Sequence, residues 1–260
     1  MQMKKALAAI VLAAGKGARM NSSLPKVLHP LSGKALLAHV LDTVFTLAPD
    51  RVIGVVGYQA EEVRSAFPDP RVEFVEQKEQ LGTGHAVLQA KPLLENFAGD
   101  VLIVCGDMPF VKAGTLKTLA SRHREANACC TLLTLKTGET KDFGRILRNE
   151  RGEVAGVVEN RDATDSQKTI DEYNSGVYLF GRNELFEALG NVDNNNSQAE
   201  YYLTDTIRYL AGKRLTVEAV QTRDANEIFG INSERDLRKA ERFVLEYRLS
   251  PENILPLKGA

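Results

Sequence analysis

The sequence "ALAAIVLAAGKGAR", residues 6–19, joins an apolar run to a basic loop that contains two glycines. Residues 6–14 are all Ala, Leu, Ile or Val, so the run predicts a strand that is buried on both faces. Neither common phosphate-binding loop fits the segment after this run. The dinucleotide fingerprint would need glycine in place of Met20, and the P-loop would need glycine at Ile10 and a hydroxyl residue at Gly17.

Further runs rich in Val, Ile and Leu occur along the chain, and the early ones alternate with stretches of helical periodicity. This alternation predicts an α/β fold with a mostly parallel sheet and helices on both faces. In such sheets ligands bind beyond the carboxyl ends of the strands, where the basic loop also lies. The expected strands are residues 7–13, 52–56, 101–105, 131–135, 154–158, 177–180 and 215–220, and the expected helices are residues 36–45, 60–67, 85–97 and 116–126.

The pattern loosens after about residue 140, where turn-rich segments at 142–144, 148–152 and 191–196 indicate a mixed insertion rather than a second domain. A final helix is predicted from Ser233, because Ser233 and Asp236 form an Asp variant of the capping box. Pro251 disfavours continuation of that helix through Ser250.

Charge is distributed unevenly along the 260 residues, although the net charge is only −1. The first 41 residues hold six Lys and Arg and no acid, so this part predicts an anionic ligand. The chain lacks Trp and has no interleaving of aromatic and basic residues, which argues against nucleic acid and favours a small phosphorylated molecule. No apolar run approaches the roughly 20 residues that span a bilayer. With three cysteines that form no framework, we expect a cytoplasmic protein with no membrane partner.

The basic loop has the chemistry of a polyphosphate site. Gly15 and Gly17 leave room for inward-turned backbone N–H groups, Arg19 offers a planar fork, and Lys26 supplies a compact charge. Two glycines alone fit a plain strand-helix turn equally well. Three cations without a local acid, Lys16 included, favour the phosphate site, although Lys16 could also point to solvent.

Polar residues after later strands are further candidates. Asp107 follows the apolar run 101–105 after Gly106, and one carboxylate there suffices for Mg²⁺ when substrate phosphates supply other ligands. The alternative is a turn residue before Pro109. Gln77 and Gln80 carry amides able to read a base edge, yet each also fits an ordinary exposed position. Gly144, Glu159 and Asn174 are candidates for hydrogen bonds to ligand hydroxyl groups, and each of them also fits an ordinary surface position.

Taken in order, these segments resemble the sugar-1-phosphate nucleotidyltransferases, and "PKVLH" at 25–29 resembles the bacterial N-acetylglucosamine-1-phosphate uridyltransferases. The resemblance covers most of residues 6–240. The motifs that carry it are "LAAGKGARMNSSLPKVLHPLSGK", "QLGTGHA", "GDMPFV", "FGRI", "VVENRDAT", "YNSGVYLF", "NNNSQAEYYLTD" and "GINSERDL".

The resemblance implies a Rossmann-like nucleotidyltransferase fold over residues 1–232, followed by a C-terminal helical extension at 233–260. It also implies that UTP and N-acetylglucosamine 1-phosphate are joined to give UDP-N-acetylglucosamine and pyrophosphate, with Mg²⁺ as cofactor. Bifunctional members continue into a left-handed β-helix acetyltransferase domain, whose hexapeptide repeats are absent from these residues. The sequence is therefore either an isolated uridyltransferase or a protein cut after the linker helix, and its oligomeric state stays open.

Carried over by motif, the resemblance implies a role for each candidate and adds Asn232, which the sequence alone indicates only as a neighbour of the Ser233 cap. Alternatives remain another sugar phosphate or nucleotide, and a non-catalytic nucleotide-binding module. The implied catalytic residues are Arg19 and Lys26, which contact the triphosphate, and the implied metal ligands are Asp107 and Asn232. The implied substrate contacts are Leu12, Ala13, Ala14, Gly15 and Gly17 at the first loop, Gln77, Gln80, Gly82 and Thr83 at uridine, and Gly144, Glu159, Asn174 and Asn232 at the amino sugar and metal end.

Overall fold

The computed structural model describes residues 5–139 and 141–249. The predicted α/β class is confirmed. The strands are β1 Ala6–Ala13, β2 Pro30–Leu31, β3 Lys34–Ala35, β4 Arg51–Val56, β5 Val72–Glu76, β6 Gly99–Cys105, β7 Cys130–Lys136, β8 Arg145–Arg148, β9 Val154–Val158, β10 Glu172–Gly181 and β11 Val217–Thr222. The α-helices are α1 Leu36–Phe45, α2 Ala60–Ala66, α3 Thr83–Gln89, α4 Ala113–Glu125, α5 Asp165–Lys168, α6 Arg182–Leu189, α7 Asp205–Gly212 and α8 Glu234–Leu249.

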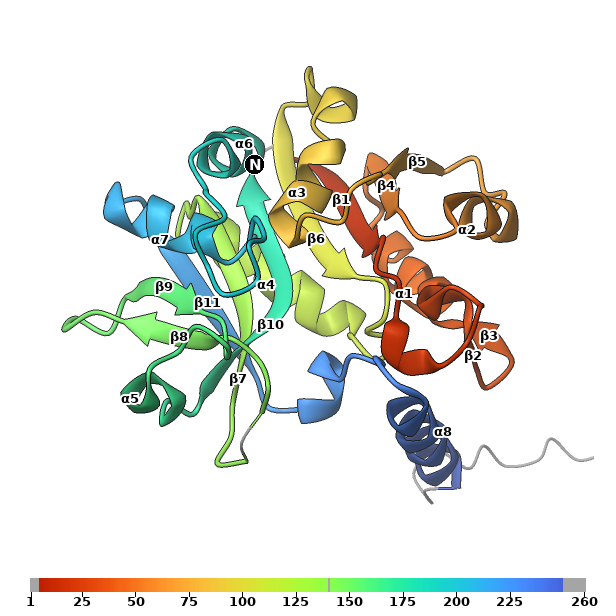
Figure 1. Cartoon of the computed structure of the whole chain (residues 1–260). Coiled ribbons are helices and arrows are strands. Elements are labelled where there is room, and N and C mark those ends of the chain that lie inside the picture. The colour runs from red at the N-terminus through yellow and green to blue at the C-terminus, as the bar shows by residue number, and fades with distance from the viewer. Residues whose placement is uncertain (1–4, 140, 250–260) are drawn as a thin grey trace, which may run out of the picture.

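The main sheet runs in the order β11-β7-β10-β6-β1-β4-β5, with β1 near its centre (Figure 1). Strands β6, β1, β4 and β5 are mutually parallel, and β11 is parallel to β7. Strand β10 lies antiparallel between β6 and β7, and the β8–β9 hairpin extends from its first half. The sheet is therefore mostly parallel with one antiparallel insertion.

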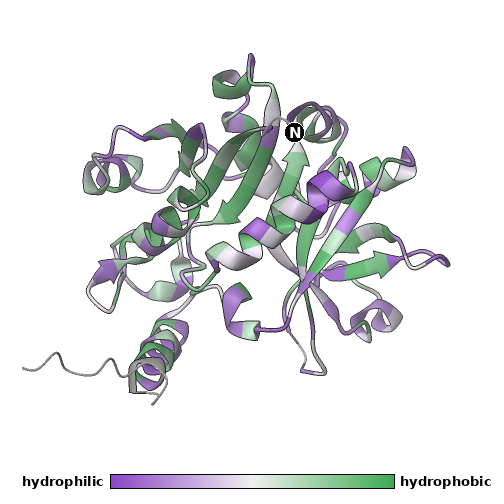
Figure 2. Ribbon diagram, turned by 180° about the vertical axis from the view of Figure 1, so that it is seen from behind, coloured by the Kyte–Doolittle hydropathy of each residue, from purple (hydrophilic) through white to green (hydrophobic). Residues whose placement is uncertain are grey.

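Two apolar layers cover the faces of this sheet. Helices α3, α6 and α7 pack on one face over Ile10 and Ile103, and helices α1, α2 and α4 pack on the other over Val11 and Val104. Because successive side chains of β1 enter opposite layers, the strand has to be apolar throughout, as residues 6–14 are. Figure 2 shows the same arrangement, with hydrophobic strands at the centre of the molecule. No helix of the described residues is long and apolar enough to cross a bilayer.

A small third cluster attaches α8 to the β2–β3 hairpin. Leu31 and Leu36 pack with Ile231 and Ala240 there, at the periphery of the molecule (Figure 1). The predicted cap of this helix is confirmed, because the Asp236 amide donates to Ser233 Oγ at 3.2 Å. The predictions for Ser250 and Pro251 lie outside the described residues.

Several expected boundaries differ from the structure. The single helix expected at 85–97 is wrong: α3 ends at Gln89, and Pro92, which has no N–H to donate, begins a separate 3₁₀ turn. The last strand begins at Val217 rather than Leu215. Strand β5 and helices α6 and α7 are additional to the expected elements.

Candidate functional site

The carboxyl ends of β1 and β6 lie side by side and gather the first candidates. Leu12 pairs with Cys105, and the Gly106 amide donates to the Leu12 carbonyl at 2.9 Å. Asp107 comes next in the chain, and its carbonyl accepts a 2.9 Å bond from the Ile231 amide. That bond brings residue 232 beside residue 107, so the sheet edge and the start of α8 meet at one point.

Lys26, Asp107 and Asn232 converge at this point. Lys26 Nζ forms an ion pair with Asp107 Oδ2 and donates to Asn232 Oδ1 at 2.9 Å. The side chains of Lys26 and Asp107 are 15% and 14% exposed, so the pair is largely shielded but reachable. Three residues far apart in sequence thus form one cluster, and the two predicted metal ligands are neighbours.

The geometry of this cluster depends on Gly17. Its φ of +63° lies in the left-handed region, and a Cβ there would lie 2.6 Å from Lys26 Cβ. Glycine is therefore needed both for the backbone turn and for the close approach of Lys26. Gly15 differs, because a Cβ at that position would meet nothing within 4 Å. The prediction that glycine is needed to leave space therefore agrees with the structure at Gly17, whereas at Gly15 no neighbouring atom of the protein requires glycine.

The donor set fits a hard divalent cation. One carboxylate oxygen and one amide oxygen already point at a single positive centre, the Lys26 ammonium, and oxygen ligands are those that such cations prefer. Among the described residues no group of three or more His, Cys, Asp or Glu could hold a metal by itself. A cation at Asp107 and Asn232 would therefore need substrate oxygens or water to complete its coordination.

Two further cations of the first loop are exposed. Arg19 lies in the 3₁₀ turn Ala18–Met20 and forms no ion pair with any described residue. Lys16 Nζ lies 5.6 Å from the centroid of the Tyr58 ring. Arg19 is therefore free to bind an anion, whereas Lys16 already has an aromatic contact.

The two predicted base-reading amides make internal hydrogen bonds. Gln77 is 4% exposed, and its Nε2 donates to the Gly82 carbonyl at 3.0 Å and lies 3.1 Å from His85 Nδ1. Gln80 Nε2 donates to the Ala14 carbonyl at 2.9 Å. Gln77 thus shapes the loop 77–84, and Gln80 ties this loop to the end of β1.

The loop 77–84 is also held by the segment that precedes α7. Gly82 has a φ of +106°, and a Cβ there would lie 2.7 Å from the Tyr201 carbonyl. That carbonyl accepts from the Gly84 amide at 2.8 Å. Thr83 Oγ1 accepts from the Leu203 amide at 3.1 Å. Two predicted uridine contacts are thus packed against residues 201–203.

Gly144, Glu159 and Asn174 come together in the antiparallel part of the sheet. The backbone amide of Asn174 donates to the Gly144 carbonyl at 2.8 Å. A Cβ added to Gly144 would lie 3.5 Å from Glu159 Oε2, so the two residues are close. Asn174 Nδ2 lies 2.7 Å from the Tyr178 hydroxyl, across a register shift in β10. The predicted sugar-binding trio is therefore one local cluster.

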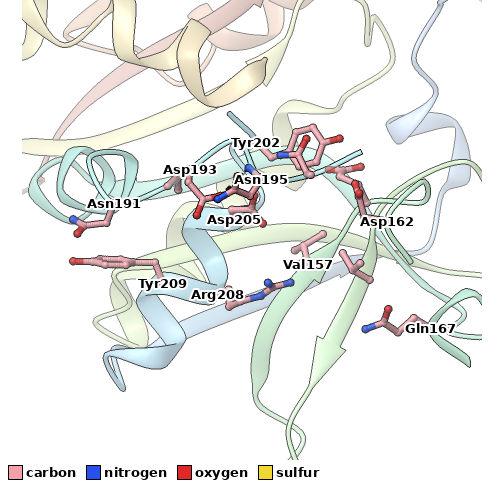
Figure 3. Close-up of a pocket in the computed structure, with 14 residues that line it drawn as sticks. Val157, Asp162, Gln167, Asn191, Asp193, Asn195, Tyr202, Asp205, Arg208 and Tyr209 are labelled. Carbon is pink, nitrogen blue, oxygen red and sulfur yellow. Dashed lines mark hydrogen bonds between the residues drawn. The ribbon is translucent and has the colours of Figure 1, made fainter. Parts of the chain in front are cut away.

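The Glu159 carboxyl is in an acidic, shielded environment. Burial raises its pKa, the Thr204 hydroxyl lowers it, and the charges of Asp205, Asp162 and Glu200 raise it further. Thr204 Oγ1 donates to Glu159 Oε1 at 2.9 Å. Asp162 and Asp205 also line a cavity of about 480 Å³ that reaches Glu159 (Figure 3). This end of the site suits hydrogen-bond donors such as hydroxyl groups.

Sequence reasoning did not single out Thr204 or Tyr178, although both stand inside the motifs "NNNSQAEYYLTD" and "YNSGVYLF". Their roles depend on contacts with Glu159 and Asn174 that no local pattern indicates. The only signal in the sequence is their place inside these motifs.

A family model described as MobA-like NTP transferase domain matches residues 9–206, most of the chain. The chain belongs to this family. As an NTP transferase domain it confirms the nucleotidyltransferase class predicted from the motifs. The match includes Lys26, Asp107 and Glu159 but ends before Asn232.

Three curated relatives of this NTP transferase are each named Bifunctional protein GlmU. The chain is 42% identical to the protein of Streptococcus equi subsp. zooepidemicus, over 95% of this chain and 53% of the relative. It is 45% identical to that of Synechococcus sp. over 94% of this chain and 38% of the relative, and 44% identical to that of Listeria welshimeri over 91% and 51%. The chain thus spans about half the length, or less, of these relatives.

Solved structures show the same fold. The NTP transferase superposes on UDP-glucose pyrophosphorylase complexed with UDP-glucose with a TM-score of 0.76, at 17% identity, over 94% of this chain and all of that one. The apo form of UDP-glucose pyrophosphorylase gives 0.75. At this identity the likeness establishes the architecture, and the site must be argued from this chain's own residues.

Proposed function

We propose that the chain transfers UMP from UTP to N-acetylglucosamine 1-phosphate, giving UDP-N-acetylglucosamine and pyrophosphate. The observation that carries the proposal is that the side-chain oxygens of Asp107 and Asn232 converge on the Lys26 ammonium beside the basic loop. Membership of the NTP transferase family and the likeness to the GlmU proteins support nucleotidyl transfer and this choice of substrates.

The reaction needs alignment more than it needs a protein nucleophile. The sugar phosphate is already an anion, so its oxygen can attack the α-phosphorus of UTP when the two are held in line, and pyrophosphate leaves. Negative charge then spreads over the phosphates. Arg19, which has no ion pair with the described residues, and Lys26 stabilise that charge. No general base is required.

A divalent cation, specifically Mg²⁺, belongs to the proposal. Asp107 and Asn232 would hold it, and Lys26 would move its ammonium from these oxygens to the phosphates. When bound, the ion supplies charge neutralisation and a template for phosphate oxygens.

The two substrates occupy opposite sides of this cluster. Residues 12–17 cradle the triphosphate, and the loop 77–84 borders uridine, with Gln80 tied to Ala14 between them. Gly144, Glu159 and Asn174 bind the amino sugar, with the acidic carboxylate accepting from its hydroxyls. We assign this chemistry to residues 1–232 and a separate structural role to α8, which packs on the β2–β3 hairpin. A cytoplasmic location completes the proposal, supported by three free cysteines, which are typical of a reducing compartment. We also propose that the chain has no nucleic-acid or membrane partner.

The test is pyrophosphate release with each of four nucleoside triphosphates against a panel of sugar 1-phosphates. We expect the highest kcat/KM for UTP with N-acetylglucosamine 1-phosphate, because internal hydrogen bonds hold the loop 77–84 in one conformation and the Glu159 carboxylate is able to accept from sugar hydroxyls. Equal release from ATP, CTP, GTP and UTP would refute the nucleotide assignment, and a preference for glucose 1-phosphate would refute the sugar assignment.

A further inference from the structure

Thr204 uses its hydroxyl in an unusual way for its position. It is the N-cap residue of α7, where a Thr side chain ordinarily accepts from a backbone amide of the first turn. Here it makes no such cap, and Oγ1 donates to Glu159 Oε1 at 2.9 Å instead. The side chain is 4% exposed, so its own access to substrate is slight. The helix thus lacks a side-chain cap, while the carboxylate gains a hydrogen bond.

The backbone around Thr204 is fixed to the opposite side of the site. The Tyr201 amide donates to the Leu81 carbonyl at 2.8 Å, and the Leu203 amide donates to Thr83 Oγ1 at 3.1 Å. These bonds join residues 201–203 to the loop 77–84 proposed to border uridine. One short segment therefore contacts the nucleotide loop through its backbone and Glu159 through Thr204.

Glu159 depends on this donor. Within residues 5–139 and 141–249 the Thr204 hydroxyl gives the one hydrogen bond to the carboxylate, on Oε1. Oε2 is left near Gly144, 3.5 Å from the position of a Cβ there. The neighbouring charges that raise the pKa of Glu159 are acidic: Asp162 follows β9, Glu200 precedes α7, and Asp205 begins it. The cation Arg208 of α7 lines the same cavity, where it lowers the pKa of Asp205.

We propose that Thr204 is a positioning residue that orients Glu159, so that Oε2 is free to accept from a sugar hydroxyl. This rests on the proposed function, in which Glu159 binds the amino sugar. Tyr178 on β10 also faces the carboxyl, but its hydroxyl meets Asn174 Nδ2. Thr204 also keeps the carboxylate ionised as the pH falls, because its hydroxyl lowers the pKa of Glu159 while burial and the neighbouring acids raise it.

The experiment compares Thr204→Val, Thr204→Ser and Thr206→Val in the full chain. Thr206 is a matched control, since it is fully buried two residues along α7 and its hydroxyl donates to the Leu203 carbonyl at 2.6 Å. We expect Thr204→Val to raise the KM for the sugar 1-phosphate about tenfold, as for loss of a hydrogen bond to a charged group. The kcat and the KM for UTP should stay within about twofold. Thr204→Ser should restore the wild-type KM, and Thr206→Val should leave it unchanged.

The pH dependence of 1/KM for the sugar phosphate gives a second readout. Loss of the Thr204 hydroxyl should raise the pKa of Glu159, so that the carboxylate becomes protonated at a higher pH as the pH falls. The acidic limb should therefore move to higher pH in Thr204→Val. It should move downward in Asp205→Asn, which removes a neighbouring negative charge. Equal KM changes in the Thr204 and Thr206 variants, or an unchanged KM in Thr204→Val, would overturn the inference. The proposed function would still stand in that case if the wild-type chain is active. An inactive wild type would overturn both.

Discussion

The two ends of the candidate site carry opposite charges that the protein leaves unpaired. At one end Lys16 and Arg19 are exposed and form no ion pair with any described residue. At the other end Glu159, Asp162 and Asp205 form none within the same part of the chain. Between them Lys26 and Asp107 neutralise each other. Unpaired charge of one sign attracts ligand groups of the other, so the ends suit phosphates and hydroxyl donors respectively.

The largest effect is expected at the neutral centre. Asp107→Ala should lower turnover about 100- to 1000-fold, the scale seen when one preorganised electrostatic group is removed from a site. The fold should survive, because Asp107 lies outside the apolar layers. Steady-state pyrophosphate release and circular dichroism melting measure both. Asp42, an exposed acid paired with Lys34, serves as control, and Asp42→Ala should retain activity. Wild-type turnover in the Asp107 variant would break the comparison.

The cationic end is tested by Arg19→Ala against Lys16→Ala. We expect the Arg19 variant to lose about 10- to 100-fold in kcat/KM for UTP, as for a lost charge-assisted hydrogen bond. Lys16 contacts the Tyr58 ring, so its variant should lose less than about threefold. Initial-rate kinetics over a range of UTP concentrations give both values. Equal losses would mean that net charge alone matters at this end.

Glycine at the loop provides a stability test. Gly17→Ala should lower the free energy of unfolding by about 1–3 kcal/mol, because of its positive φ and the Lys26 side chain in the way. Gly15→Ala should change it by less than about 0.5 kcal/mol. Urea unfolding measures both. A loss of activity in a stable Gly15 variant would indicate that bound phosphate needs the space, whereas full activity there would remove Gly15 from the site.

The smallest effect concerns metal binding without nucleotide. Lys26→Met removes the ammonium from Asp107 and Asn232, so the affinity for Mn²⁺ should rise about two- to fivefold, because the metal no longer has to displace an ion pair. Lys26→Arg should show a smaller rise, because it keeps the charge. Electron paramagnetic resonance of free Mn²⁺ measures the affinity. A fall in affinity in the Met variant would show that Lys26 does not compete with metal.

Much of the fold follows from local sequence, and the exceptions have physical reasons. Apolar runs predict most of β1, β4 and β6 because strands buried on both faces are mainly apolar, and the charged Arg51 and Asp100 lie at the starts of β4 and β6. The antiparallel placement of β10 between β6 and β7 is a matter of long-range pairing, which no local pattern encodes. Strand β5 escapes prediction because it lies at the edge, where "VEFVE" alternates with acids.

The site divides in the same way. The glycine loop, Arg19 and Asp107 are visible from residue types placed after strands. Asn232 is not, because its position beside Asp107 depends on the bond between the Ile231 amide and the Asp107 carbonyl. The sequence suggests Gln77 as a base reader, and in the structure its amide braces its own loop. The sequence thus shows which residues have suitable side-chain chemistry, whereas the tertiary fold determines which groups those side chains contact.

The central claim is metal-dependent uridylyl transfer, and product stoichiometry tests it most directly. The purified chain, stripped with EDTA, is mixed with UTP and N-acetylglucosamine 1-phosphate with and without added Mg²⁺, and products are quantified by mass spectrometry and a pyrophosphate assay. We predict UDP-N-acetylglucosamine and pyrophosphate in equal amounts with Mg²⁺ and neither without it. No sugar nucleotide with Mg²⁺, inorganic phosphate in place of pyrophosphate, or equal product in EDTA would contradict the account.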